Sequence, residues 1–359
     1  SRSTINDNDE QLRNQCAYSG GGYHEPIILF QIVRAAFRRL CFMQQDKEYT
    51  FRRSKRQRRS PKVQPEHSAS STKDDGTQCL RQILQSKKKI LVVSGSGASA
   101  AAGLSTFSSG LYPKAAKKFQ LANGQDLFRY SFYQQRPRDL FLFFQELYQE
   151  ARQAEPTLTH RVLQRMMSSG RLLRHYTLNI DGLATTPSFN SNASSSSVDT
   201  MPPPEPVVVE LHGSLHQLIC TACGAALPTA SVINSSNRFT KLPSCPECSD
   251  DTCLRFRVLL YDDQQGTSIV KNNNQILENM KKDLQNTQAI IWMGISFEQQ
   301  ASCEHFERML PSSWSQVPIF IVNPEADQAL FCLQTAVGGL EDHAIHLVPC
   351  TCDELFFGL

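Results

Sequence analysis

The sequence lacks any long apolar run and carries little net charge. No stretch of 18 apolar residues occurs in the 359 residues, so a membrane-spanning helix is not expected. The longest apolar region, 26–43, is interrupted by Arg34, Arg38 and Arg39. The formal net charge is +3, and we expect neither a membrane partner nor nucleic-acid binding outside one short basic tail.

That tail is the run 52–62, which holds seven lysines and arginines and no acid. Such a run stays solvated and is available to a nuclear import receptor or to nucleic acid, but a solubilising tail explains it equally well. Residues 64–77 are rich in Ser, Asp and Lys. We expect residues 1–77 to be a disordered basic extension, residues 78–359 to be the folded domain, and the protein to be nuclear, or otherwise cytoplasmic.

A disulfide framework is also missing, because eight of the twelve cysteines are scattered along the chain. This suits a reducing compartment. The other four form two CxxC pairs, Cys220 with Cys223 and Cys245 with Cys248. Paired CxxC turns present four thiolates tetrahedrally, which is typical of a closed structural zinc site; a disulfide pair or free thiols are the alternative. We expect a zinc module at about 214–257. A closed site leaves no open position for chemistry.

Five apolar runs, each ending in glycine or polar residues, predict the main fold. They cover residues 90–93, 174–179, 207–211, 289–293 and 318–322. The first has no alternation, which suits a parallel strand buried on both faces. The expected class is α/β: a Rossmann-like parallel sheet with a helical insertion around the Phe-rich stretch 140–147. A Ser- and Pro-rich stretch at about 186–206 reads as a low-complexity surface insertion.

Gly95 and Gly97 follow the first predicted strand. Glycines two apart allow a tight turn and a close approach to a pyrophosphate, which the next helix can bind at its N-terminus. Ala100 stands where a third glycine would complete G-x-G-x-x-G, and an ordinary strand-to-helix turn explains the pair as well.

In order along the chain come this glycine loop, Thr177-Leu178-Asn179-Ile180-Asp181, His212-Gly213, the two CxxC pairs, Gly294-Ile295-Ser296 and Asn323-Pro324-Glu325. This order resembles the sirtuin family of NAD-dependent protein deacylases over about 78–356. The stretch 170–183 also looks like the fungal nuclear branch that deacetylates histones. The resemblance implies NAD and zinc as cofactors, an acetylated protein such as a histone as the partner, and a substrate cleft beside the zinc module.

The resemblance also implies roles for particular residues. His212 matches the base that deprotonates the ribose hydroxyl after nicotinamide leaves, and Asn179 and Asp181 match the catalytic pair of the nicotinamide-ribose pocket. Eight residues match positions that bind NAD in the family: Gly95, Gly97, Ser99, Phe107, Gly294, Ser296, Asn323 and Cys352. The acyl-peptide strand matches Val258, Leu259 and Tyr261. His160 and His216 are expected to be ordinary helix and module residues.

Several positions depart from the family pattern. Thr106 and Ser108 replace an acid and an NAD-binding arginine, and Leu178 replaces a glutamine. In the peptide strand, the family's V-V-x-F-G-E is Val258 to Asp263, with Tyr261 for the phenylalanine and Asp262 for the glycine. Two functions therefore remain open: a working deacetylase with weakened NAD affinity, or a catalytically impaired relative that binds NAD or a protein partner. A zinc-ribbon nucleic-acid binder fits less well, because 220–248 has few basic residues.

Overall fold

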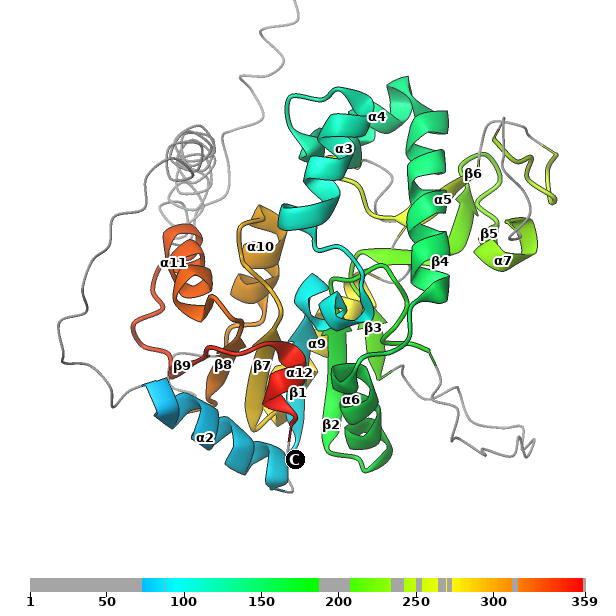
Figure 1. Cartoon of the computed structure of the whole chain (residues 1–359). Coiled ribbons are helices and arrows are strands. Elements are labelled where there is room, and N and C mark those ends of the chain that lie inside the picture. The colour runs from blue at the N-terminus through cyan, green and yellow to red at the C-terminus, as the bar shows by residue number, and fades with distance from the viewer. Residues whose placement is uncertain are drawn as a thin grey trace, which may run out of the picture. The chain divides into compact units, whose positions relative to one another are not determined.

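The computed structural model describes residues 73–86, 88–186, 207–233, 242–249, 254–263, 269, 273–311 and 316–357. The apolar region 26–43, the basic run 52–62 and most of the predicted insertion 186–206 lie outside these residues. Figure 1 shows the described elements. None of the described helices is long and apolar enough to cross a membrane.

A six-stranded parallel sheet forms the centre of the domain, in the order β3-β2-β1-β7-β8-β9. Its strands are β1 (Ile90–Ser94), β2 (Leu172–Thr177), β3 (Val208–Glu210), β7 (Ala289–Met293), β8 (Ile319–Val322) and β9 (Ile345–Val348). Ser94 at the end of β1 pairs with Thr177 on one side and Met293 on the other. The chain therefore leaves three central strands at one edge, where an open parallel sheet places its ligand.

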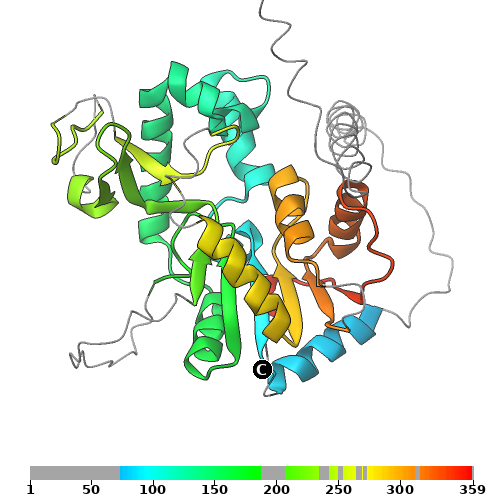
Figure 2. The same cartoon turned by 180° about the vertical axis from the view of Figure 1, so that it is seen from behind.

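Helices cover both faces of this sheet. Leu91 and Val93 of β1 pack with α9 (Asn273–Asn286), α10 (Gln300–Arg308) and α11 (Ala326–Ala336) on one face. Ile90 and Val92 pack with α2 (Lys73–Gln85), α6 (Leu158–Ser168) and α12 (Cys352–Leu355) on the other. Figures 1 and 2 show α9 and α6 on opposite sides of the strands. Burial on both faces explains why β1 is apolar without alternation.

A second hydrophobic centre joins a group of helices to a small antiparallel sheet. The helices are α3 (Tyr112–Phe119), α4 (Tyr130–Gln135) and α5 (Pro137–Gln153). The sheet has the order β5-β4-β6, with β4 at Gly213–Cys220, β5 at Ala226–Pro228 and β6 at Leu254–Val258; the short helix α7 (Thr229–Val232) follows β5. Phe141 of α5 lies on Phe256 of β6 with ring centres 5.1 Å apart. The helical insertion thus carries the module that holds the CxxC pairs.

The α/β expectation is confirmed, with differences in detail. α2 begins at Lys73, ahead of the boundary predicted at 78. The second strand ends at Thr177: the Leu178 amide makes the last ladder bond, to the Ser94 carbonyl, and the backbone amide of Asn179 then donates to the Thr177 hydroxyl instead. The edge strand β9 was not predicted, and its residues are mostly half-buried.

Candidate functional site

The loops after β1 and β7 lie against each other with no side chain between them. The Gly97 amide donates to the Gly294 carbonyl at 3.0 Å. A Cβ on Gly97 would lie 2.6 Å from the Gly294 Cα, and Gly294 has a φ of 65°. Both positions therefore need glycine for this contact alone. The result is a backbone-lined cradle at the carboxyl edge of the sheet.

Ser99, Asn179 and Asp181 form one hydrogen-bonded cluster beside this cradle. The side-chain amide of Asn179 donates through Nδ2 to the Gly95 carbonyl at 3.0 Å and to the Ser99 hydroxyl at 3.1 Å. Ser99 donates to the Asp181 carboxylate at 2.7 Å. The side-chain oxygen of Asn179 is buried and has no hydrogen-bond partner in the described part of the chain. Because an unpaired buried acceptor is costly, this oxygen fits a ligand that brings a donor.

His216 forms a hydrogen bond with the backbone of Asp181. Its Nε2 lies 2.9 Å from the Asp181 carbonyl, so this nitrogen must carry the proton. His216 therefore does more than an ordinary module residue, which the sequence did not indicate. His160 is a structural residue, as expected: with Thr157 it forms the capping box of α6.

A pocket that is partly open to solvent lies over the cluster. Its walls include Ser99, Asn179 and Asp181 and, from the facing segment, Leu104 and Phe107. Phe107 begins the π-helical turn Phe107–Leu111 and packs edge-on against Phe128 at 6.0 Å. The structure therefore brings Phe107 to the same pocket as the pair expected to line it. The Leu178 side chain is buried in the core cluster of the sheet and is not among the pocket residues.

His212 lies in the turn after β3. Its Nδ1 is 3.1 Å from the Leu178 carbonyl, which can only accept, so Nδ1 carries the proton and Nε2 keeps its lone pair. Burial lowers the pKa of His212 to about 4, against the opposing effect of the Leu178 carbonyl. The imidazole is thus neutral near pH 7, as a base must be. The ring of His305 from α10 lies 5.4 Å from it between ring centres, a contact the sequence did not indicate.

Gly213 ties His212 to the predicted peptide strand. It has a φ of 81°, and a Cβ there would lie 2.1 Å from the Arg257 carbonyl. Val258 pairs with Gly213, and the Leu259 amide donates to the His212 carbonyl at 2.9 Å. Only glycine therefore allows β6 to run directly beside the histidine.

One edge of the segment 259–261 is paired along its length, and the other is paired only in part. The Tyr261 amide donates to the Phe128 carbonyl, and the Tyr130 amide donates to the Tyr261 carbonyl. The Leu260 amide, which faces the other way in an extended strand, has no acceptor among the described residues. Leu259 is 36% exposed. On the same edge, the Val258 carbonyl accepts from Arg255 and the Leu260 carbonyl accepts from the Asp263 amide, so the Leu260 amide is the backbone group left to bond a further strand.

The remaining predicted NAD residues follow the strands β7, β8 and β9. Ser296 is half-buried two residues beyond Gly294. Asn323 donates to the Ile295 carbonyl at 3.0 Å and accepts from the Glu325 amide, so it holds the loop that carries Ser296. Cys352 is buried at the start of α12 in the cluster that includes Ala98, and burial raises its pKa to about 12. Their contacts with NAD stay predictions.

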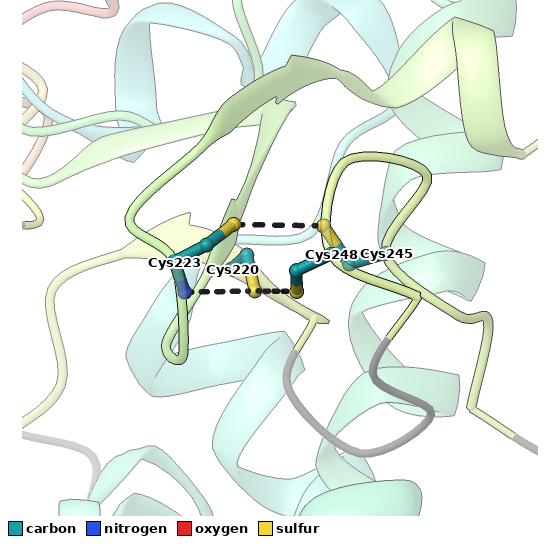
Figure 3. A group of neighbouring side chains, drawn as sticks. All are labelled: Cys220, Cys223, Cys245 and Cys248. Atoms are coloured by element: carbon teal, nitrogen blue, oxygen red, sulfur yellow. Dashed lines mark hydrogen bonds between the residues drawn. The ribbon is translucent and has the colours of Figure 1, made fainter.

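The four CxxC thiols converge as predicted (Figure 3). All four sulfur atoms lie within 4.8 Å of one another, with 3.7 Å between Cys220 and Cys248 and 3.8 Å between Cys223 and Cys245. A tetrahedron with Zn–S bonds of about 2.3 Å has edges of ~3.8 Å. Burial of Cys220 would raise its pKa, but N–H groups of Cys223 and Ala222 lower it to about 7, which favours the thiolate. The donor set therefore fits zinc.

A parallel sheet with facing glycine loops at its carboxyl edge defines a dinucleotide-binding fold, here with a four-thiol module attached. The model of the Sir2 family matches residues 95–301. The chain belongs to the Sir2 family, which confirms the resemblance read from the motifs.

Two fungal relatives show how far the likeness extends. The NAD-dependent protein deacetylase hst4 of Emericella nidulans is 35% identical over 176 residues, which is 47% of this chain and 28% of that protein. The NAD-dependent histone deacetylase HST4 of Saccharomyces cerevisiae is 32% identical over 187 residues, 49% of this chain and 48% of that protein. The matched region thus spans less than half of either relative.

Solved structures support the fold. A Sir2 homologue mutant in complex with 2′-O-acetyl ADP ribose has a TM-score of 0.55 at 20% identity, and covers 77% of this chain and 92% of that one. A Sir2 homologue–NAD complex has a TM-score of 0.54 at 18% identity, covering 80% and 93%.

Zinc content tests the thiol cluster. We expect one zinc ion per chain by elemental analysis, and we expect Cys245→Ser to lower the melting temperature markedly, because metal-binding free energy is folding free energy in such a module. Cys332→Ser, at a half-buried cysteine far from the cluster in sequence, is the matched control. Well-folded protein with substoichiometric zinc would contradict the assignment.

The buried histidines predict acid sensitivity. Burial lowers the pKa of His175 to about 3 and that of His212 to about 4, against about 6.5 in an unfolded chain. Between these values the unfolded chain binds more protons, so the free energy of unfolding should fall as the pH drops below about 6.5. The slope is about 1.4 kcal/mol per pH unit for His175, which is fully buried. Urea denaturation from pH 7.5 to 4.5 measures it; a constant free energy between pH 7 and 5 would contradict this prediction.

Proposed function

We propose that this protein is an NAD-dependent protein lysine deacetylase. The observation that carries the proposal is the unpaired side-chain oxygen of Asn179, set in a polar cluster beside a glycine-lined cradle. An acceptor left unpaired inside such a cluster fits a ligand that brings a donor. The names of the relatives, which describe NAD-dependent deacetylases, support the same activity.

Each residue then has a defined task. When bound, NAD supplies the ribose carbon that takes the acyl oxygen and the nicotinamide that leaves. Gly95, Gly97 and Gly294 leave room for the phosphates, and Asn179 and Asp181 orient the ribose end. His212 accepts the ribose hydroxyl proton at Nε2, which is free because Nδ1 is committed to the Leu178 carbonyl. Phe107 excludes water and leaving group from the pocket. The thiol cluster only holds the module together.

The position of Leu178 weakens the alternative that this protein is a catalytically impaired relative. This side chain points into the core cluster of the sheet, so the exchange of glutamine for leucine does not remove a polar group from the pocket as described. Thr106 uses its backbone carbonyl to accept from Gly110 and Leu111 at the π-helical turn. The side chain of Ser108 lies outside the described residues.

The proposed substrate is an acetylated lysine in an extended peptide, such as a histone tail. The peptide would lie along the segment 258–261, beside Val258, Leu259 and Tyr261, and bond the Leu260 amide with its main chain. A relative named as a histone deacetylase supports this class of substrate.

The decisive variant is His212→Ala. It should bind NAD nearly as the natural chain does, because the base acts after nicotinamide leaves, while turnover falls by roughly 10²–10⁴-fold. Isothermal titration with NAD and mass spectrometry of an acetyl-lysine histone peptide measure the two quantities. His343→Ala, at a half-buried histidine in the turn before β9, should keep full turnover. Absence of NAD binding at millimolar concentration, with no deacetylated peptide, would remove the enzyme assignment.

We also propose that the protein works in the nucleus and that the basic run 52–62 directs it there. The run has the composition of an import signal, and relatives named for histones support a chromatin substrate. Deletion of 52–62 from a fluorescently tagged chain should shift it to the cytoplasm. A deletion variant that stays nuclear would reduce the run to a solvated tail.

A further inference from the structure

Three consecutive residues at the end of the peptide strand are each held by a side chain from a different segment. The Tyr261 hydroxyl lies 3.1 Å from the Tyr112 hydroxyl of α3. Asp262 accepts from Arg129 at 2.7 Å. Asp263 accepts from Arg255 of β6 at 2.8 Å. Tyr261 and Asp262 are among the departures from the family pattern noted in the sequence.

The tyrosine pair exists because of one of these departures. A phenylalanine at 261 would leave the Tyr112 hydroxyl without this partner. Burial raises the pKa of Tyr112 well above its ordinary value, and the nearby Tyr261 and Glu298 raise it further. The phenol of Tyr112 therefore keeps its proton throughout the physiological range. The contact links the first turn of α3, next to the Phe107 turn, to the peptide strand.

Asp262 replaces a glycine but keeps a glycine-like backbone, with a φ of 58°. Aspartate tolerates this left-handed conformation better than most residues. Its carboxylate is 77% exposed, so the ion pair with Arg129 contributes little by itself. Its effect is local: Arg129 lies between Phe128 and Tyr130, whose backbones pair with Tyr261.

Arg255 forms hydrogen bonds at both ends of the segment 258–263. It donates to the Val258 carbonyl at 3.0 Å and to Asp263, and its guanidinium lies 4.8 Å from the ring centre of Tyr133. The side chains of Arg255 and Asp263 are 4% and 0% exposed. Removing either partner of such a buried pair would leave an uncompensated charge, so the pair ties Asp263 to β6.

We propose that these contacts hold the segment 258–263, at and beyond the end of β6, in its peptide-binding conformation before the peptide arrives, with the Tyr112–Tyr261 hydroxyl pair as the positioning contact for acyl-lysine peptide. This inference rests on the proposed deacetylase function. A strand that is already ordered loses less conformational freedom when a peptide pairs with it, so the peptide binds more tightly. The family's glycine would leave this strand free; the present chain fixes it with side chains.

Tyrosine-to-phenylalanine variants test the contact without risk to the fold. Tyr112→Phe and Tyr261→Phe each remove one hydroxyl and keep the ring. Each should raise KM for an acetyl-lysine histone peptide about 2- to 12-fold, the effect of losing one hydrogen bond, with kcat and the Kd of NAD unchanged. The double variant should be no weaker than either single variant, because both remove the same bond.

Tyr130→Phe is the matched control. Tyr130 is a half-buried neighbour whose hydroxyl has no hydrogen-bond partner among the described residues. Its KM for the peptide should equal that of the natural chain. In an active enzyme, an unchanged peptide KM in Tyr261→Phe overturns the inference.

Hydrogen exchange supplies a readout that does not need turnover. In protein without peptide or NAD, the amides of Leu259 and Tyr261 should exchange faster in both tyrosine-pair variants than in the natural chain and in Tyr130→Phe. If the natural chain shows no deacetylation, the proposed function fails, and exchange then decides the inference by itself. Equal exchange rates in all variants of such an inactive protein would overturn it.

Discussion

The close approach of Gly97 and Gly294 is the constraint on which the site depends. Parallel register brings the ends of β1, β2 and β7 level, but side chains would normally keep the loops that follow them apart. Two glycines let the backbones meet, and the Gly95 carbonyl then accepts a hydrogen bond from the side-chain amide of Asn179. The polar cluster, the pocket above it and the position of Ser99 all follow from that contact.

Behind the cluster lies a chain of buried hydrogen bonds within the sheet. The Ser94 hydroxyl donates to the Thr177 hydroxyl, so it must accept from His175 Nε2 at 2.8 Å. The Thr177 hydroxyl in turn accepts from the backbone amide of Asn179. These groups have no access to water, and their mutual satisfaction stiffens the floor of the pocket. Pre-organisation of this kind lets Asn179 and Asp181 meet a ligand without rearrangement.

The sequence predicted those parts of the molecule that depend on local pattern. Apolar runs located five of the six parallel strands, and CxxC spacing located the four converging thiols. The edge strand β9 was not predicted, because its half-buried residues form a weaker apolar pattern. Contacts between distant segments could not be read in the same way. Tyr112 and Tyr261 are 149 residues apart, and no spacing rule pairs them. Leu178 was expected to alter the pocket, yet its side chain lies in the core, because it continues the alternation of β2 on the same face as Tyr176.

One strand connects the metal module to the proposed base. β4 begins at Gly213, directly after His212, and ends at Cys220, the first thiol of the cluster. Between these ends β4 pairs with β6, with one irregularity between Ser214 and Leu218. A chain that had not acquired its metal would therefore lose the alignment of His212 as well as the module. The thiol cluster and the proposed base are thus the two ends of one strand, and the metal reaches the cleft only through β4.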